Sequence, residues 1–388
     1  MSEQQDYLPM QEVPAEKPDE NIELGREKIG RFYCALHETP TRVFEPGVIP
    51  VRQQLILRSS NKWANGTALR YYFFDRDTDG ENVLLSNGTT VWRSWVGSEA
   101  EKAVVRRGFQ VWKDVGIGLS FQEVNEREEA EIRIGFMKND GAWSWLGREI
   151  LKFGPNERTM NFGWDITPSG ELDTAVHEIG HTLGFPHEHQ NPNAGIEWDE
   201  EAVYASLAAH PNRWDRQTTY WNIIRKLSLS EVQGSEWDPN SVMHYPLDAG
   251  FIKKPVDYVD GLQPAGGLSE RDKAWVQIFY PPLTEVDEEE LKPSQSALLN
   301  ISAGEQRNFT ITPQETRYYE FRTIGVSDSV MVLFEDDRGE LRYRTADDDS
   351  GKDSNAYFRI RLLKGRRYVL RIRLYYSERP KETAVIMW

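Results

Sequence analysis

Residues 177–187 read His-Glu-Ile-Gly-His-Thr-Leu-Gly-Phe-Pro-His and carry the strongest chemical signal in the chain. On a helix, residues four apart share one face, so His177 and His181 can direct their imidazoles at a single ion. Gly184 can adopt a positive φ and turn the chain sharply, which lets His187 return as a third ligand. The run therefore predicts a helix that ends in a turn and carries a metal site of three histidines.

Three neutral imidazoles and a water are the ligands of a catalytic zinc ion, because a structural site closes its fourth position with protein. Such an ion lowers the pKa of its bound water to about 7. Glu178 lies one residue round the helix from His177, where it can act as general base without ligating the metal. We expect one Zn²⁺ per chain; the alternative is a surface helix with scattered histidines.

A second motif lies downstream, where residues 241–245 read Ser-Val-Met-His-Tyr. Together, HExxHxxGFxHE and SxMHY resemble the astacin family of the metzincins, with the similarity running from about residue 62 to 280. The resemblance implies that Met243, in the Met-turn, forms an apolar floor beneath the ligands. It also implies that Tyr245 binds the metal at rest and then supports the oxyanion, and that Glu188 contacts the mature N-terminus. Without the resemblance, the alternative interpretations are that Met243 is a core residue, that Tyr245 is a buried side chain with a polar hydroxyl, and that Glu188 is a solvated acid.

Cys34 is the only cysteine, so no intrachain disulfide can form. It lies upstream of the folded body, and the aspartate that keeps astacins latent has no match in this leader. A thiolate binds zinc readily and would displace the catalytic water. The sequence thus predicts a zymogen in which Cys34 is the latency ligand; the alternative is a small buried apolar residue.

The order of the predicted elements favours an α+β, metzincin-like zincin domain with a mixed sheet over residues 61–283. Strands are expected at 69–74, 119–124 and 130–136, and helices at 98–115, from about 170, and after Ser269. The last helix is expected to pack Ala274, Trp275 and Ile278 inward. The strand 130–136 is the predicted edge along which an extended substrate would add.

The remaining segments predict three further parts. Residues 1–60 are expected to be a disordered N-terminus followed by a leader that resembles a pro-segment, and 284–295 an acidic linker. Short alternating runs over 296–388 predict an all-β sandwich. Its pattern, with Ala303-Gly304-Glu305 and the run 364–370, resembles the bacterial pre-peptidase C-terminal domain.

Composition and charge limit the kinds of molecule that the protein is expected to bind. The net charge of −16 argues against nucleic acid, and no stretch reaches the ~18 apolar residues of a membrane span. The N-terminus lacks the apolar region of a signal peptide, which leaves a cytoplasmic address, non-classical export or secretion open. Asp75, Asp77 and Asp79 begin like a calcium loop, but Ser86 stands where the twelfth-position acid belongs, so an ordinary acidic turn is favoured over Ca²⁺.

These observations predict a zinc metalloendopeptidase that hydrolyses internal peptide bonds of polypeptide substrates. The alternative is a binding protein whose catalysis is lost and whose C-terminal sandwich does the adhesion. Glu178 and Tyr245 favour the enzyme, because a binding module needs neither. Subsite preference, natural substrate and oligomeric state do not follow from the sequence.

Overall fold

The computed structural model describes residues 33–36, 61–63, 65–85, 88–228, 236–282, 289–299, 301, 305–325, 327–352, 355–376 and 383–388. Of the predicted leader, Tyr33–Leu36 therefore lies inside the described residues. The disorder predicted for the first 30 residues lies outside them.

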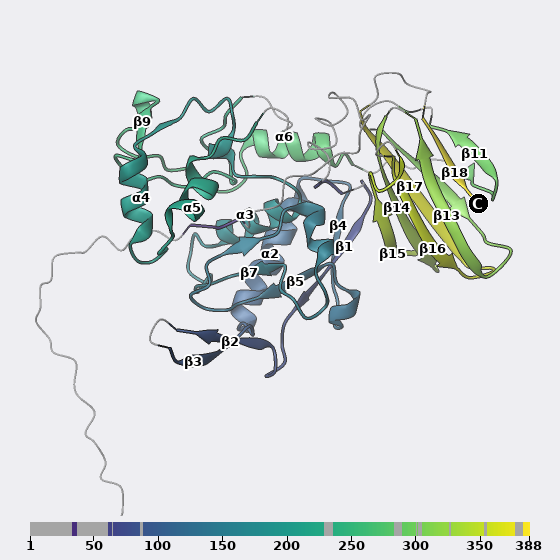
Figure 1. Ribbon diagram of the computed structural model, residues 1–388, viewed down its shortest axis with the longest axis horizontal. Helices are drawn as coiled ribbons and strands as arrows, with labels where there is room; N and C mark the ends of the chain where they lie inside the picture. Colours follow the sequence, from purple (N-terminus) through teal and green to yellow (C-terminus); the bar gives the residue numbers. More distant parts are fainter. Residues whose placement is uncertain are drawn as a thin grey trace, which may run out of the picture.

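A five-stranded mixed sheet forms the base of the first part of the chain (Figure 1). Its order is β4 (Ser120–Glu123), β1 (Ala68–Phe73), β5 (Ile132–Gly135), β7 (Met160–Asn161) and β6 (Trp143–Ser144). Neighbours pair in parallel except β6, which runs antiparallel to β7. A hairpin of β2 (Gly80–Leu84) and β3 (Thr90–Ser94) projects from it. The predicted mixed sheet is confirmed.

The prediction that residues 130–136 form the edge strand is wrong. β5 lies between β1 and β7, and β6 is the edge on that side. Arg133 stands at the polar alternate position of this strand but does not face solvent. Its side chain is buried and donates to the main-chain oxygens of Ala130, Phe153 and Glu157.

Two helices pack on the sheet through one continuous apolar core. Helix α2 (Glu99–Asp114) begins at Ser98, whose side chain forms a capping box with Glu101. Helix α3 (Leu172–Thr182) crosses beside it and carries the histidine motif. Trp112 of α2 ties the two together by donating from Nε1 to the oxygen of Val176 (2.8 Å). The histidine motif thus lies on a helix that packs against α2 and against strand β6.

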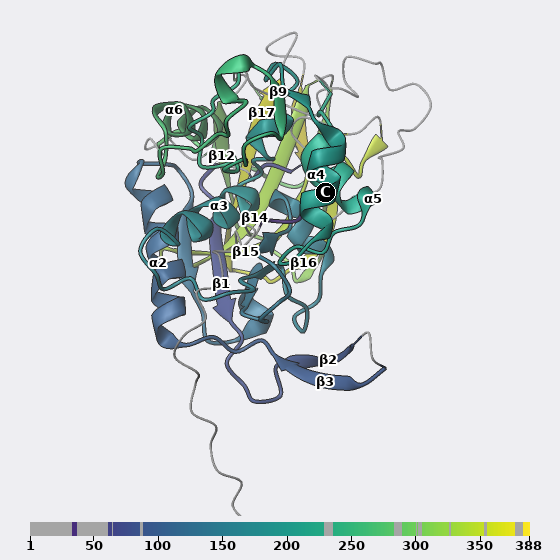
Figure 2. The same cartoon turned by 90° about the vertical axis from the view of Figure 1, so that its left-hand side faces the viewer.

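The chain then builds a smaller lobe that faces the end of α3 (Figure 2). It contains α4 (Glu200–Ala208), α5 (Arg216–Thr219), a π-helical turn (Tyr220–Ile224) and the short strands β8 (Glu197–Trp198) and β9 (Ile252–Lys254). Helix α6 (Glu270–Phe279) closes this part and is capped by Ser269 as predicted. Its buried face differs from the prediction: Ala274 and Ile278 (57% exposed) face outward, while Val276 and Phe279 pack inward.

The C-terminal residues form two sheets packed on one apolar core, which confirms the predicted sandwich. One sheet has the order β10 (Glu289–Glu290), β12 (Gln306–Ile311), β17 (Arg367–Tyr376), β14 (Asp328–Asp337) and β15 (Glu340–Asp347). The other has the order β11 (Gln295–Leu298), β18 (Ala384–Met387), β13 (Arg317–Ile324) and β16 (Tyr357–Leu362). The expected acidic linker, 284–295, overlaps β10 and the start of β11.

The sandwich lies against the first part of the chain beside β1 and α6 (Figure 1). Arg148 and Asp348 form a largely buried ion pair across the contact (2.7 Å), and Arg373 donates to the main-chain oxygen of Ile278 (3.0 Å). Both arginine side chains are mostly buried at this contact. None of the described helices is long and apolar enough to cross a membrane.

Candidate metal centre and active site

Helix α3 presents His177 and His181 one turn apart, with their rings 4.6 Å apart and nearly perpendicular. The helix ends at Gly184, whose φ of +93° requires the left-handed conformation that a Cβ disfavours. Gly184 N–H donates to His181 O, and Phe185 N–H donates to Gly180 O, so the turn is closed by backbone hydrogen bonds. His187 returns to the helix, and its ring lies 4.6 Å from that of His181.

Backbone carbonyls fix which ring nitrogens face inward. Nδ1 of His177 donates to the oxygen of Val242, and Nδ1 of His181 donates to that of Phe185, both at 2.7 Å. Because each Nδ1 carries the proton, each Nε2 keeps a free lone pair. Outer hydrogen bonds of this kind orient the imidazoles of metal sites. His177 Nε2 is buried and has no hydrogen-bond partner among the residues that the structure describes, and a metal ion at this position would be a partner for its lone pair.

The three histidines and Cys34 form one cluster, whose candidate ligand atoms all lie within 4.8 Å of one another. Nε2 of His181 is 3.1 Å from Nε2 of His187 and 3.4 Å from the Cys34 sulfur. All four side chains are buried. Three imidazole nitrogens and one thiol are a donor set that suits Zn²⁺.

Burial sets the protonation of these groups. It lowers the pKa of His177 to about 4 and holds the pKa values of His181 and His187 well below their usual range. The imidazoles are therefore neutral, as metal ligands must be. Burial, reinforced by Glu178, raises the pKa of the Cys34 thiol. A divalent cation among these groups reverses that preference and favours the thiolate, so the cluster fits zinc.

Glu178 lies beside the cluster rather than within it. Its Oε2 is 3.4 Å from the Cys34 sulfur, and it forms no ion pair with a lysine or arginine of the described residues. Burial raises its pKa to about 8. A carboxylate with raised basicity facing the fourth ligand position is placed to accept a proton there.

Tyr245 also contacts the cluster. Its hydroxyl donates to the main-chain oxygen of Cys34 (2.5 Å) and lies 2.5 Å from Nε2 of His187. Met243 packs directly against α3, where a Cβ on Gly180 would lie 2.4 Å from the methionine sulfur. Gly180 is thus needed for this close approach, which the sequence motif alone did not indicate.

The segment that carries Met243 and Tyr245 is anchored by Asp272 of α6. This carboxylate accepts hydrogen bonds from the Ser241 hydroxyl (2.6 Å) and from Val242 N–H (2.8 Å). It also caps its own helix through Ser269 N–H (2.9 Å). Burial raises the pKa of Asp272.

The weaker sequence candidates lie apart from the cluster. Glu188 accepts hydrogen bonds from Asp238 N–H (3.0 Å) and the Asn191 amide (3.1 Å), and burial raises its pKa to about 7. In the acidic turn, Asp79 pairs with Arg127 (2.8 Å) and accepts from Asp75 N–H (3.2 Å). An arginine and backbone amides therefore already compensate the Asp79 carboxylate.

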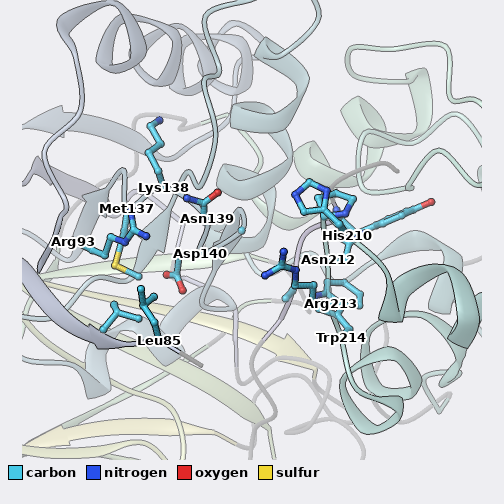
Figure 3. Close-up of a pocket in the computed structure, with 15 residues that line it drawn as sticks. Leu85, Arg93, Met137, Lys138, Asn139, Asp140, His210, Asn212, Arg213 and Trp214 are labelled. Atoms are coloured by element: carbon cyan, nitrogen blue, oxygen red, sulfur yellow. Dashed lines mark hydrogen bonds between the residues drawn. The ribbon is translucent and has the colours of Figure 1, made fainter. Parts of the chain in front are cut away.

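Two cavities are lined in part by residues of the segment Tyr33–Leu36. One, of about 620 Å³, is lined by Cys34, His177, Glu178 and Tyr245 together with residues before α3 and α6. The second, of about 580 Å³, lies between Met137–Asp140 and His210–Trp214 and also contacts Tyr33 and Ala35 (Figure 3). Residues of the leader segment thus line both cavities: Cys34 the first, and Tyr33 and Ala35 the second.

A buried set of three histidines with an adjacent carboxylate and phenol defines a mononuclear centre of the type found in zinc-dependent peptidases. The family model of Astacin, a peptidase family, matches residues 94–257. That segment is astacin-like, which confirms the predicted resemblance, and the zinc cofactor agrees with it.

Individual relatives are similar to parts of the chain. Zinc metalloproteinase nas-26 of Caenorhabditis elegans is 29% identical over 164 residues, which cover 41% of this chain and 36% of the relative. The solved structure of myroilysin is 29% identical over 58% of this chain and 98% of its own, with a TM-score of 0.49. For the sandwich, the pre-peptidase C-terminal domain of a Bacillus anthracis collagenase is 13% identical over 27% of this chain and 100% of its own, with a TM-score of 0.22. The chain spans about a third of the length of nas-26.

Proposed function

We propose that the protein is a zinc metalloendopeptidase that hydrolyses internal peptide bonds of polypeptides and is latent as the full chain. The observation that carries the proposal is the buried cluster in which His177, His181 and His187 converge, two of them with Nδ1 fixed by backbone carbonyls. Bound Zn²⁺ would supply a Lewis acid that polarises the scissile carbonyl and makes water acidic. The metal ligands in this proposal are the three histidines.

Glu178 is the proposed general base. Its carboxylate faces the position that the Cys34 thiol occupies, so it would face a water there once the thiol has left. It would take a proton from that water and deliver it to the leaving amine. Its burial supports this role, because the raised pKa makes the carboxylate a stronger base.

Tyr245 is the proposed oxyanion donor. Its hydroxyl already donates to a main-chain carbonyl, that of the residue whose side chain reaches the metal cluster. A substrate carbonyl at this place would receive the same hydrogen bond, which strengthens as negative charge develops on the oxygen. Met243 would keep the ligands in place from below.

Cys34 is the proposed latency ligand of a leader that must leave before substrate can enter. Its sulfur lies among the ligand atoms, and its neighbours Tyr33 and Ala35 line the adjoining cavity. We propose the corresponding division of the chain into a leader to residue 60, a catalytic domain over 61–283, a linker over 284–295 and the C-terminal sandwich.

The proposal is tested by zinc analysis and peptide cleavage with the full chain before and after limited proteolysis. We expect one zinc per chain, cleavage of a quenched peptide after the leader is cut, loss of cleavage with a chelator and recovery on adding Zn²⁺. Absence of stoichiometric zinc would contradict the metal centre. Zinc without cleavage after leader removal would favour a binding protein.

A further inference from the structure

The leader segment is held by its backbone as well as by its cysteine. Tyr33 N–H donates to Oδ1 of Asn212 (3.0 Å), and Leu36 N–H donates to Oδ1 of Asn222 (2.7 Å). Between them, Ala35 N–H donates to the main-chain oxygen of Ala142 (3.2 Å), next to the edge strand β6. Main-chain donors of the leader on both sides of Cys34 are thus bound by side-chain amides of the smaller lobe.

Asn222 is built into the structure as an acceptor. It is 2% exposed and lies in the π-helical turn Tyr220–Ile224, an irregularity that often marks functional sites. Its Nδ2 donates to the oxygen of Thr218 (3.1 Å), which turns Oδ1 towards the leader. Its main-chain oxygen accepts from Nε2 of His189 (2.9 Å), two residues after the third histidine.

Asn212 lies on the same lobe and lines the second cavity. Figure 3 shows Asn212 opposite Met137–Asp140, with Trp214 nearby. The Tyr33 ring packs at 6.4 Å from that of Trp214 and at 5.1 Å from that of Tyr245. The two asparagines therefore accept main-chain N–H groups from leader residues on either side of Cys34, whose sulfur lies in the metal cluster.

An amide oxygen that accepts a main-chain N–H does not read the side chain of the bound residue. Such an acceptor suits a cleft that takes peptides of many sequences, because every non-proline residue offers the same donor. The edge strand β6 has only two residues, Trp143–Ser144, so the first lobe alone offers a short edge for pairing. Without a bound peptide, the buried Oδ1 of Asn222 would lose its partner, which costs free energy unless water replaces it.

We propose that Asn212 and Asn222 are substrate-positioning residues, which accept backbone N–H groups of the substrate on opposite sides of the scissile bond once the leader has left. This inference rests on the proposed peptidase function. It adds the lobe of α4 and α5 to the substrate-binding surface. In the latent protein, the leader backbone makes the hydrogen bonds that the substrate backbone would make after activation.

The test uses the full chain, activated by limited proteolysis if it is latent, and one parent peptide with a series of ester analogues. Each analogue replaces one backbone amide by an ester, which removes one N–H donor and keeps the side chains. For the wild-type protein we expect kcat/KM to fall about three- to tenfold at one position on each side of the scissile bond, mainly through KM. In Asn222→Ala the penalty should vanish at one of these positions, and in Asn212→Ala at the other.

Three controls keep structural damage apart from lost positioning. Asn222→Asp retains an acceptor oxygen and should retain both penalties, and Gln217→Ala, on the exposed surface of α5, should behave as wild type. Zinc content and thermal unfolding should match the wild type in every variant. Equal loss on all peptides, with both ester penalties intact, would overturn the inference while leaving the peptidase in place. If the activated wild-type protein cleaves no peptide, the proposed function and this inference both fail.

Discussion

The sulfur of Cys34 lies 3.4 Å from Nε2 of His181, although 147 positions separate the two residues in the chain. The same sulfur lies 3.4 Å from Oε2 of Glu178. One thiol thus contacts both a proposed metal ligand and the proposed base. A substrate or water that needs this place must displace it.

Cys34→Ala should raise the peptidase activity of the full chain. Without the thiol the metal keeps three protein ligands, and we expect at least about tenfold more cleavage of a quenched peptide, because the competent fraction grows. Activation should be incomplete, since the backbone contacts of the leader remain. Ala35→Ser, one residue along, is the matched control and should stay latent. Equal activity of all three proteins would show that Cys34 does not block the site.

Glu178→Gln should remove turnover while leaving the metal bound. The amide retains the size of the side chain but cannot take a proton, so kcat should fall about 10²-fold or more. Glu171→Gln is a suitable control, because Glu171 lines the same cavity but bonds to Trp164 and Thr174 instead. Steady-state kinetics of both variants measures the loss of kcat, and zinc analysis shows whether the metal is retained. Near-normal turnover in Glu178→Gln would exclude it as the base.

Tyr245→Phe should lower kcat more than it changes KM. In the proposed mechanism its hydroxyl donates to the substrate carbonyl, and removal of one oxyanion donor costs about 10²-fold in kcat. Tyr204→Phe on α4 should have no such effect. An unchanged kcat in protein that has lost its leader would restrict Tyr245 to holding the leader.

Asp272→Ala should destabilise the protein and disturb the site at a distance. The carboxylate accepts from Ser241, Val242 and Ser269, so its loss leaves buried donors unpaired. We expect the free energy of unfolding to fall by about 2–3 kcal/mol in denaturant titration. Glu270→Ala, in the same first turn but with its ion pair to Lys273 at the surface, should cost far less. Similar stabilities for the two variants would contradict the anchoring role.

The catalytic helix was predictable because its signals are local. The ligand spacing on α3 and the need for a positive φ at Gly184 lie within a few residues of what they determine, and the same holds for the capping residue of the neighbouring helix α2. The place of β5 inside the sheet was not predictable, because strand order depends on pairing between distant segments. The burial of Arg133 on this strand likewise depends on carbonyls that only the folded chain brings together.

The cleft residues were missed for a related reason. Asn212 and Asn222 belong to no motif, and their partners are backbone groups about 180 positions away, at 179 and 186. Gly180 and Asp272 also act through tertiary contacts, with Met243 and with Ser241. A single cysteine in a leader could be singled out from the sequence, but its place beside His181 depends on the fold.

The most direct test is the zinc X-ray absorption spectrum of the purified full chain. The proposed centre predicts three nitrogen ligands at about 2.0–2.1 Å and one sulfur at about 2.3 Å. In Cys34→Ala the sulfur shell should be absent while the nitrogen shell remains. A wild-type spectrum without sulfur, or with fewer than three imidazole ligands, would contradict a latent centre formed by His177, His181, His187 and Cys34.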